Sequence, residues 1–346
     1  EGDDDDHDEA EDISLKFRRH NGRFEGGFRN INSFLNKFTM TVNYSDWKHQ
    51  ELEEDTVGTE FFNKQAVYRG QFEQERRGKL SGRFGFWGMH RDYETVGAES
   101  LAPPVKQNAF AGFALEELDF ETFRLQFGGR LEHNRYDNTG GLPNRTFTGF
   151  SGSTGLAVPV GPRSTVSASY THSYRAPALE ELYNLGPHVG TLTYEIGDPN
   201  LRGERGNGLE LSFKHTSQRV NAEASLYRYG FRNFVFLSPT GEVEDGLLVS
   251  NYAQGDTRFA GAETKFDYGL HQNLWLNLGL DVVDARLTAT DTPLPRIPPV
   301  RARIGLDARW NGFQENQSLT IAARKRRIFT TETRTAGYAV PALDAT

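Results

Sequence analysis

Two groups of residues in this sequence carry side chains that could hold a metal ion. The chain opens with an acidic run, Glu1–Asp12, whose carboxylates surround a single histidine, His7. A second histidine, His188, lies midway through a long polar stretch, and Glu99 lies in another. Zinc takes imidazole and carboxylate ligands where no thiolate is offered, and the chain has no Cys. We therefore consider His188 and Glu99 for a main site and His7 for a weak collector of cations, with an ordinary solvated loop as the alternative for each.

Other polar and aromatic residues are weaker candidates. Three of them stand near the outer ends of predicted strands, where polar residues that line a pore are common: His90, His49 and Glu195. The aromatic residues that could contact an organic metal chelate are Tyr183, Tyr194, Phe61 and Phe62. The chain has no nucleophile elbow, no zinc-protease motif and no phosphate-binding loop, so we do not expect an enzyme.

The elements that must position these residues are β-strands with one apolar and one polar face. Apolar and polar residues alternate through stretches such as 122–132, 274–282 and 301–310. A period of two residues is the signature of a strand whose faces differ. The predicted strands are long, roughly 9–15 residues, and their polar faces are rich in charge, which is typical of a transmembrane barrel with lipid outside and water inside. We find no fixed-period repeat that would favour a propeller or a solenoid.

Composition agrees with a membrane barrel. The chain has 36 Gly, 25 Phe and 13 Tyr, as glycine-rich strands and aromatic girdles require. Its mean hydropathy is −0.63 and no window of 18 apolar residues exists, which excludes a transmembrane helix. A net charge of −8 argues against nucleic-acid binding. The basic run Arg324–Arg327 is expected to contact lipopolysaccharide phosphates or to pair with carboxylates of the lumen.

The order of turns predicts an antiparallel barrel, present as a fragment of roughly 15–16 strands. Short turns alternate with long loops, and the long ones include Gln50–Gly58, Arg175–Gly206 and Ser238–Leu248. We expect the barrel to be incomplete at both ends. The predicted strands lie at about 12–28, 35–49, 59–75, 80–95, 108–118, 122–136, 146–158, 164–174, 207–215, 219–236, 249–254, 257–270, 274–289, 300–310 and 316–328, with a last one from 338.

The longest loop carries a recognisable motif at each end. One end reads Arg175-Ala176-Pro177, and the other reads Gly197-Asp198-Pro199-Asn200-Leu201, followed by Glu204. Pro177 stops the strand ladder, and the Gly/Asp/Pro/Asn cluster favours a turn that re-aims the chain into the next strand. Together with the strand pattern, these motifs resemble the signature of TonB-dependent outer-membrane receptors. The resemblance covers residues 1–346 as a single barrel domain of the plugged, 22-strand type.

A narrower resemblance points to the zinc-uptake branch of these receptors. It rests on the segments 44–63, 91–104 and 182–196 and on the acidic opening, although a zinc-catching loop would be expected to hold more histidines than His7 alone. The resemblance implies an active transporter of the outer membrane of a Gram-negative-type bacterium, with a plug domain that couples it to the TonB–ExbB–ExbD complex. It implies no required cofactor, with zinc as a transported substrate. A siderophore or haem receptor, and a passive porin without a plug, remain the alternatives.

Overall fold

The protein is an all-β chain whose strands form one curved, antiparallel sheet. The computed structural model describes residues 13–53, 56–97, 100–188, 192–244 and 246–346. Its wall strands are β1 (Ile13–Arg29), β2 (Leu35–Glu53), β3 (Thr56–Gln74), β4 (Leu80–Gly97), β5 (Val105–Asp119), β6 (Arg124–Asn138), β7 (Arg145–Pro159), β8 (Ser164–Arg175), β11 (Glu204–Thr216), β12 (Val220–Glu244), β13 (Leu247–His271), β14 (Leu274–Leu287), β15 (Arg301–Trp310), β16 (Phe313–Ala322) and β17 (Tyr338–Ala345). The helix α1 (Leu179–Tyr183) and two short strands, β9 (Leu185–His188) and β10 (Thr193–Ile196), belong to the loop between β8 and β11.

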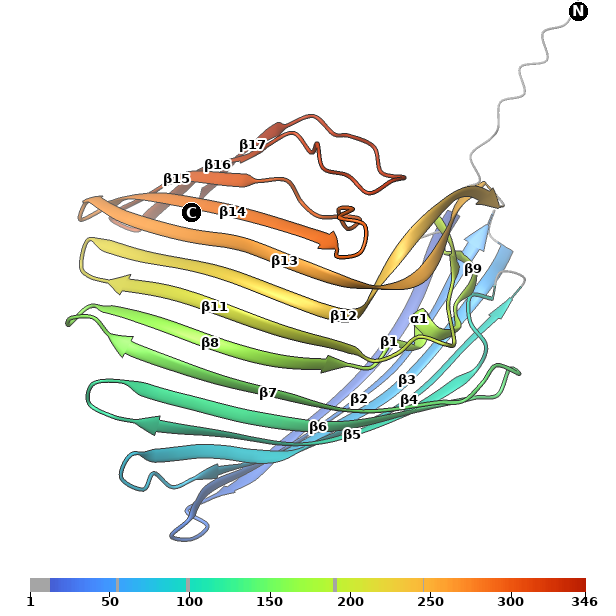
Figure 1. Cartoon of the computed structure of the whole chain (residues 1–346), viewed down its shortest axis with the longest axis horizontal. Helices are drawn as coiled ribbons and strands as arrows, with labels where there is room; N and C mark the ends of the chain where they lie inside the picture. Colours follow the sequence, from blue (N-terminus) through green and yellow to red (C-terminus); the bar gives the residue numbers. More distant parts are fainter. Residues whose placement is uncertain (1–12, 54–55, 98–99, 189–191, 245) are drawn as a thin grey trace, which may run out of the picture.

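Each wall strand pairs with its neighbour along the chain, and β8 pairs with β11 across that loop. Tight turns join the strands at one end of the sheet, and the longer connections gather at the other (Figure 1). The predicted antiparallel barrel architecture and the alternation of short and long connections are thus confirmed. Among the described residues, no helix is long and apolar enough to cross a membrane.

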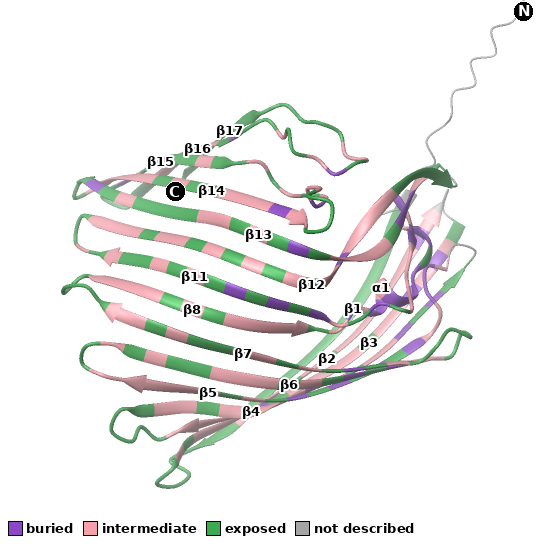
Figure 2. Cartoon of the chain, viewed as in Figure 1, coloured by how far each residue is buried: buried purple, intermediate pink, exposed green. Residues whose placement is uncertain are grey.

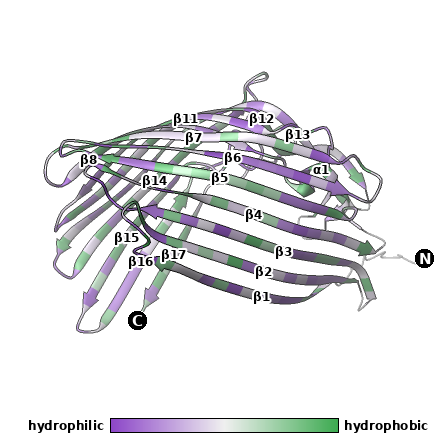
Figure 3. Cartoon of the chain, turned by 90° about the horizontal axis from the view of Figure 1, so that it is seen from below, coloured by the Kyte–Doolittle hydropathy of each residue, from purple (hydrophilic) through white to green (hydrophobic). Residues whose placement is uncertain are grey.

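The alternating pattern separates two faces as expected. On β14, Leu278 and Leu280 are exposed on the outer face, where Leu278 pairs with Phe266 of β13 and Ile304 of β15. The neighbouring Asn277 points inward and donates a hydrogen bond to Asp267 Oδ1 at 2.9 Å. Figure 3 shows the alternation as apolar and polar bands along the strands. The outer face is therefore apolar and the lumen is lined by polar side chains.

Three segments differ from the sequence prediction. Strands 249–254 and 257–270 are one strand, β13, and the predicted loop Ser238–Leu248 is largely strand, because β12 runs to Glu244. The pair Gly255-Asp256 resembles a turn sequence, which is why the sequence predicts a break there. In the structure β13 continues through this pair, and a bulge between Phe231 and Phe234 on β12 accommodates the change of register. β2 and β3 likewise extend into the predicted loop Gln50–Gly58. The strand predicted at 316–328 ends at Ala322, so that the basic run 324–327 lies in the following connection.

The two faces give a direct prediction for stability. Leu278→Arg places a charge on the apolar outer face and is expected to lower the free energy of unfolding by about 2–4 kcal/mol if the site lies near the bilayer midplane. Asn277→Arg faces the lumen beside the Asp267 carboxylate and is expected to be tolerated. Denaturant titrations of the receptor refolded into vesicles measure both. Equal losses at the two positions would contradict the assignment of the faces.

Candidate functional site

The loop between β8 and β11 folds inward and packs against the wall near the outer mouth of the lumen. Its helix α1 buries Leu179, Leu182 and Tyr183 completely or nearly so. These side chains join a cluster of buried residues from the wall strands and their connections: Phe61, Tyr93, Leu101, Ala102, Val105, Tyr136, Phe147, Leu201 and Val235. Figure 2 shows the buried residues gathered around α1 and the adjoining strand ends. The loop is thus a packed part of the barrel interior.

Arg175 ties both ends of this loop together. Its guanidinium donates to Glu204 on β11 at 2.6 and 2.7 Å and to Glu181 on α1 at 2.9 and 3.0 Å. Glu204 also accepts a hydrogen bond from the backbone of Val235, and Glu181 accepts one from the backbone of Ala178. Bidentate arginine–carboxylate pairs are strong and directional. The motif residues therefore fix the direction in which the loop leaves and re-enters the wall.

The second motif closes the loop by a tight backbone contact. Gly197 lies so close to α1 that an added Cβ would stand 2.8 Å from the backbone nitrogen of Tyr183, so only glycine fits without movement. Asp198 Oδ1 then accepts hydrogen bonds from the backbone and side-chain nitrogens of Asn200, which shapes the turn around Pro199. Leu201, at the end of this motif, is buried in the cluster around α1. At the other end, the Tyr136 hydroxyl donates to the Pro177 carbonyl at 2.7 Å.

A buried carboxylate, Glu195 of β10, orients the residues of this loop. It lies 3.0 Å from His188 Nδ1 and accepts hydrogen bonds from Asn184 Nδ2 at 3.0 Å and the Tyr252 hydroxyl at 2.9 Å. Burial opposes ionisation of Glu195, but the hydrogen bonds outweigh it and lower its pKa to about 2. The same bond to Glu195 raises the pKa of His188, against the opposing effect of burial. Glu195 is thus an anion that fixes the ring of His188.

His188 borders a cavity of about 660 Å³ between the docked loop and the wall strands β1–β3. The lining residues are Leu15, Phe17, Arg19, Ser45, Trp47, His49, Glu51, Asn63, Gln65 and His188. Cavities of this size accept a small ligand. Its wall combines aromatic surfaces with imidazole, carboxylate and amide groups.

Within the cavity, His49 is the second imidazole. Its ring stacks on Phe61 and on Trp47, with centroids 4.0 and 4.7 Å apart, and its Nε2 lies 3.7 Å from Glu51 Oε1. Its Nδ1 is buried without a hydrogen-bond partner in the part of the chain that the structure describes. Across the same described residues, no group of three or more metal-ligating side chains is already assembled. A metal ion would therefore need ligand movement or ligands from elsewhere.

The whole chain, residues 1–346, matches the family described as "TonB dependent receptor-like, beta-barrel". The chain belongs to the TonB-dependent receptor β-barrel family. This confirms the family predicted from the loop motifs and the strand pattern.

Several solved structures share the fold. The copper transporter OprC matches with a TM-score of 0.84 at 17% identity, over 96% of this chain and 58% of that one. The Serratia marcescens hemophore receptor HasR, in complex with its hemophore HasA and heme, gives 0.76 at 14% identity, over 96% and 60%. The FrpB iron transporter from Neisseria meningitidis gives 0.72 at 12%, over 96% and 56%. This chain thus spans a little over half the length of these structures, and identities this low show the fold alone.

The structure brings together only some of the residues singled out in the sequence. His188, Glu195 and His49 lie around the docked loop and its cavity, as does Tyr194, which pairs with Pro187 and Val249. His90 instead lies on the outer face, 2.8 Å from Asn108 Oδ1, and is not brought near His188. His7 and Glu99 lie outside the described residues.

The aromatic candidates divide between the core and the outer face. The Tyr183 hydroxyl donates to the Pro143 carbonyl at 2.9 Å, and burial raises its pKa to about 12. Phe61 is buried behind His49, and Phe62 lies under the Lys48 ammonium at 4.9 Å. Tyr183 and Phe61 therefore hold the loop and the wall in place.

Two residues of the basic run 324–327 form salt bridges. Lys325 binds Glu332 at 2.8 Å and Arg327 binds Asp284 at 2.8 Å, so both pair with carboxylates.

Three residues of the site were not predicted from the sequence: Glu51, Asn184 and Tyr252. For Glu51, a signal was present, because the alternation Ser45, Trp47, His49 continues to it through what looks like a loop.

The pair Glu195–His188 predicts a pH dependence for docking of the loop. Because the pKa of His188 is raised, its contribution is complete below the ordinary value of 6.5 and is lost as the pH rises through the raised pKa. Because the pKa of Glu195 is lowered, its contribution is complete above the ordinary value of 4.5 and is lost progressively as the pH falls from there through the lowered pKa of about 2. Amide hydrogen exchange across 185–196, corrected for its intrinsic pH dependence, should be slowest between these ordinary values. His188→Ala should remove the loss of protection on the alkaline side, whereas His215→Ala, at the far end of β11 from the loop, should preserve it.

Proposed function

We propose that the full-length receptor takes up a scarce metal ion, zinc being the first candidate, across the outer membrane. In this proposal a plug domain closes the barrel and couples it to the TonB–ExbB–ExbD complex. The observation that carries the proposal is the cavity beside the docked loop, which His188, His49 and Glu51 all line. No resident cofactor is invoked, and the metal is the cargo.

The contact between Glu195 and His188 supports a metal-binding role for the imidazole. A carboxylate that holds one ring nitrogen fixes the orientation of the ring and makes the other nitrogen a better metal ligand. With Nδ1 of His188 held by Glu195, coordination would use Nε2. Two imidazoles and a carboxylate form a donor set that suits zinc and copper better than calcium or magnesium. Further ligands would come from Glu99 or from the plug.

A metal chelate is the second candidate. The cavity is larger than a bare ion needs, and Trp47 and Phe17 give it aromatic surface against which an organic ligand could pack. Similar structures include a copper transporter, a hemophore receptor in complex with heme and a ferric yersiniabactin uptake receptor, so the fold accommodates both kinds of cargo. A porin, in contrast, would need no plug. The full-length sequence distinguishes it from a transporter.

The zinc proposal predicts the effect of removing the imidazole of His188. His188→Ala should weaken zinc binding by the plug-containing receptor by about tenfold or more, since one of about four ligands is lost. His188→Asp should retain part of the affinity, because zinc also accepts carboxylate oxygen. Calorimetric titration with zinc measures both.

His172→Ala is the matched control for this measurement. His172 lies on the outer face, where it stacks on Phe150 and its Nδ1 lies 3.0 Å from Asn207 Oδ1, so its loss should leave zinc binding intact. Identical isotherms for the wild type and His188→Ala would refute the zinc site and leave the general receptor function standing.

The acidic opening predicts a different phenotype. A run of carboxylates with one histidine binds divalent cations weakly and with little preference for zinc. Deleting residues 1–12 should therefore slow uptake at low metal concentration and leave uptake at saturating metal nearly unchanged. Loss of uptake at saturating metal would show that the run belongs to the main site.

A further inference from the structure

The helix α1 connects two strands of the wall that are not neighbours. Glu180 and Glu181 follow one another in α1, and successive residues of a helix point about 100° apart. Glu181 accepts hydrogen bonds from Arg175 of β8, whereas Glu180 accepts one from Arg91 of β4 at 2.7 Å. Strands β5, β6 and β7 lie between β4 and β8 in the sheet. Two arginines therefore attach the helix to two separate parts of the wall.

The two attachments differ in strength. Arg175 donates four hydrogen bonds to Glu181 and Glu204 and so holds the point where the loop leaves β8. Among the described residues, Arg91 holds α1 by a single hydrogen bond. The side chains of Arg91 and Glu180 are only 15% and 35% exposed, so the loss of one partner leaves the other charge poorly solvated. The attachment at Arg91 is thus the weaker one, but its loss has a cost.

The guanidinium of Arg91 also contacts the cavity beside the docked loop. Its Nε donates to Asn63 Oδ1 at 3.1 Å, and Asn63 lines that cavity together with His188. The guanidinium lies over the ring of the buried Tyr93, with its carbon 4.8 Å from the ring centroid, which fixes its position on the wall. Arg91 therefore joins the cavity wall to the helix.

A series of hydrogen bonds leads from Glu180 to His188. The backbone nitrogen of Asn184, which caps the C-terminus of α1, donates to the Glu180 carbonyl at 3.1 Å. The side chain of the same Asn184 donates to Glu195, and Glu195 lies 3.0 Å from His188 Nδ1. A displacement of α1 away from β4 would therefore reach the imidazole ring through Asn184 and Glu195.

We propose that Arg91 is a positioning residue of the cargo site, because its ion pair with Glu180 holds α1 against β4 and thereby keeps His188 at the cavity. Arg91 itself does not bind the metal. When the pair is broken, α1 and His188 leave their places while Arg175 keeps the end of the loop on the wall, so the affinity for cargo falls. This inference rests on the proposed function for its cargo, but the attachment of α1 can be measured without metal.

Amide hydrogen exchange of the metal-free, full-length receptor tests the attachment. In R91Q and in the milder E180Q, the amides of residues 179–188 should exchange about tenfold faster than in the wild type, while residues 173–175, held by Arg175, should keep their protection. The charge exchange R91E/E180R puts opposite charges back in contact and should restore slow exchange, whereas R91E alone should not. Wild-type exchange at 179–188 in R91Q and E180Q, or exchange in R91E/E180R as fast as in R91E, would overturn the proposal.

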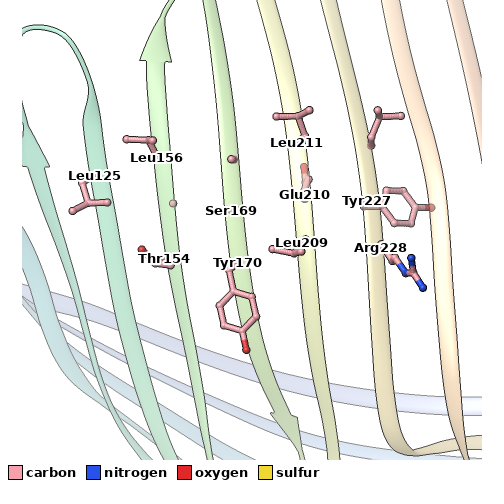
Figure 4. Close-up of a pocket in the computed structure, with 13 residues that line it drawn as sticks. Leu125, Thr154, Leu156, Ser169, Tyr170, Leu209, Glu210, Leu211, Tyr227 and Arg228 are labelled. Atoms are coloured by element: carbon pink, nitrogen blue, oxygen red, sulfur yellow. The ribbon is translucent and has the colours of Figure 1, made fainter.

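Two control variants separate this effect from a general loss of positive charge. R130Q removes an arginine of β6 that pairs with Glu132 within its own strand. R228Q removes an arginine at the margin of the apolar groove on the outer face of β6–β12 (Figure 4). Among the described residues, neither arginine forms a salt bridge with the loop. Both variants should exchange like the wild type at 179–188, and a tenfold effect in either one would contradict the assignment to Arg91.

Calorimetric titration of the same variants with zinc tests the positioning role. R91Q and E180Q should bind zinc about tenfold more weakly than the wild type, and R91E/E180R should recover most of the affinity. Unchanged zinc affinity in R91Q and E180Q would overturn this inference and leave the proposed function standing. A wild-type receptor that binds no zinc would instead refute the proposed cargo, and hydrogen exchange alone would then confirm or overturn the attachment at Arg91.

Discussion

The constraint on which the structure depends is the satisfaction of backbone hydrogen bonds in a medium without water. Every amide and carbonyl group in the lipid zone must pair, and the antiparallel ladders between neighbouring wall strands provide those partners, except along the outer edges of β1 and β17, which pair with no strand among the described residues. Because a strand has a period of two, the same ladders force one face of each strand toward lipid and the other toward the lumen. Leu278 and Asn277 are adjacent in the chain, yet they lie in these two different environments. The lumen is thereby left with polar groups available for binding.

A second interaction converts the open wall into a shaped site. Arg175 binds carboxylates of both α1 and β11, so the loop between β8 and β11 is held against the wall instead of projecting into solvent. Glu195 then orders the inner part of the loop and sets the position of His188. The motif residues therefore serve the site indirectly. They hold the backbone so that the cavity lies between the loop and β1–β3.

The barrel could be predicted from the sequence because its pattern is local. Alternation such as that of 274–282 needs only neighbouring residues to be read, and the turn sequences mark most strand ends. The prediction was wrong where a local turn signal was overridden, as at Gly255-Asp256, whose irregularity a bulge on the neighbouring strand accommodates. The helix α1 was not predicted, since it has only five residues and is stabilised by burial of Leu179 and Leu182.

The candidate site could be predicted only in part, because its contacts depend on strand pairing and on residues far apart in the chain. His188 and Glu195 stand out by residue type, but their contact depends on the pairing of β9 with β10. Tyr252, on β13, donates a hydrogen bond to Glu195 although it lies 57 positions later in the chain, and no local sequence pattern predicts that contact. His90 is the opposite case. Its residue type and its place near a strand end suggest a ligand, but its side chain lies on the outer face beside Asn108. Which face a side chain occupies decides its role more than its chemical type does.

The most direct test of this account is to locate the metal itself. Anomalous diffraction at the zinc absorption edge, from crystals of the full-length receptor grown with zinc, places the bound ion without assuming its ligands. The account predicts an anomalous peak in the cavity beside the docked loop, within coordination distance of His188 Nε2 and near His49 and Glu51. A strong peak elsewhere in the lumen, with this cavity empty of anomalous signal, would contradict it.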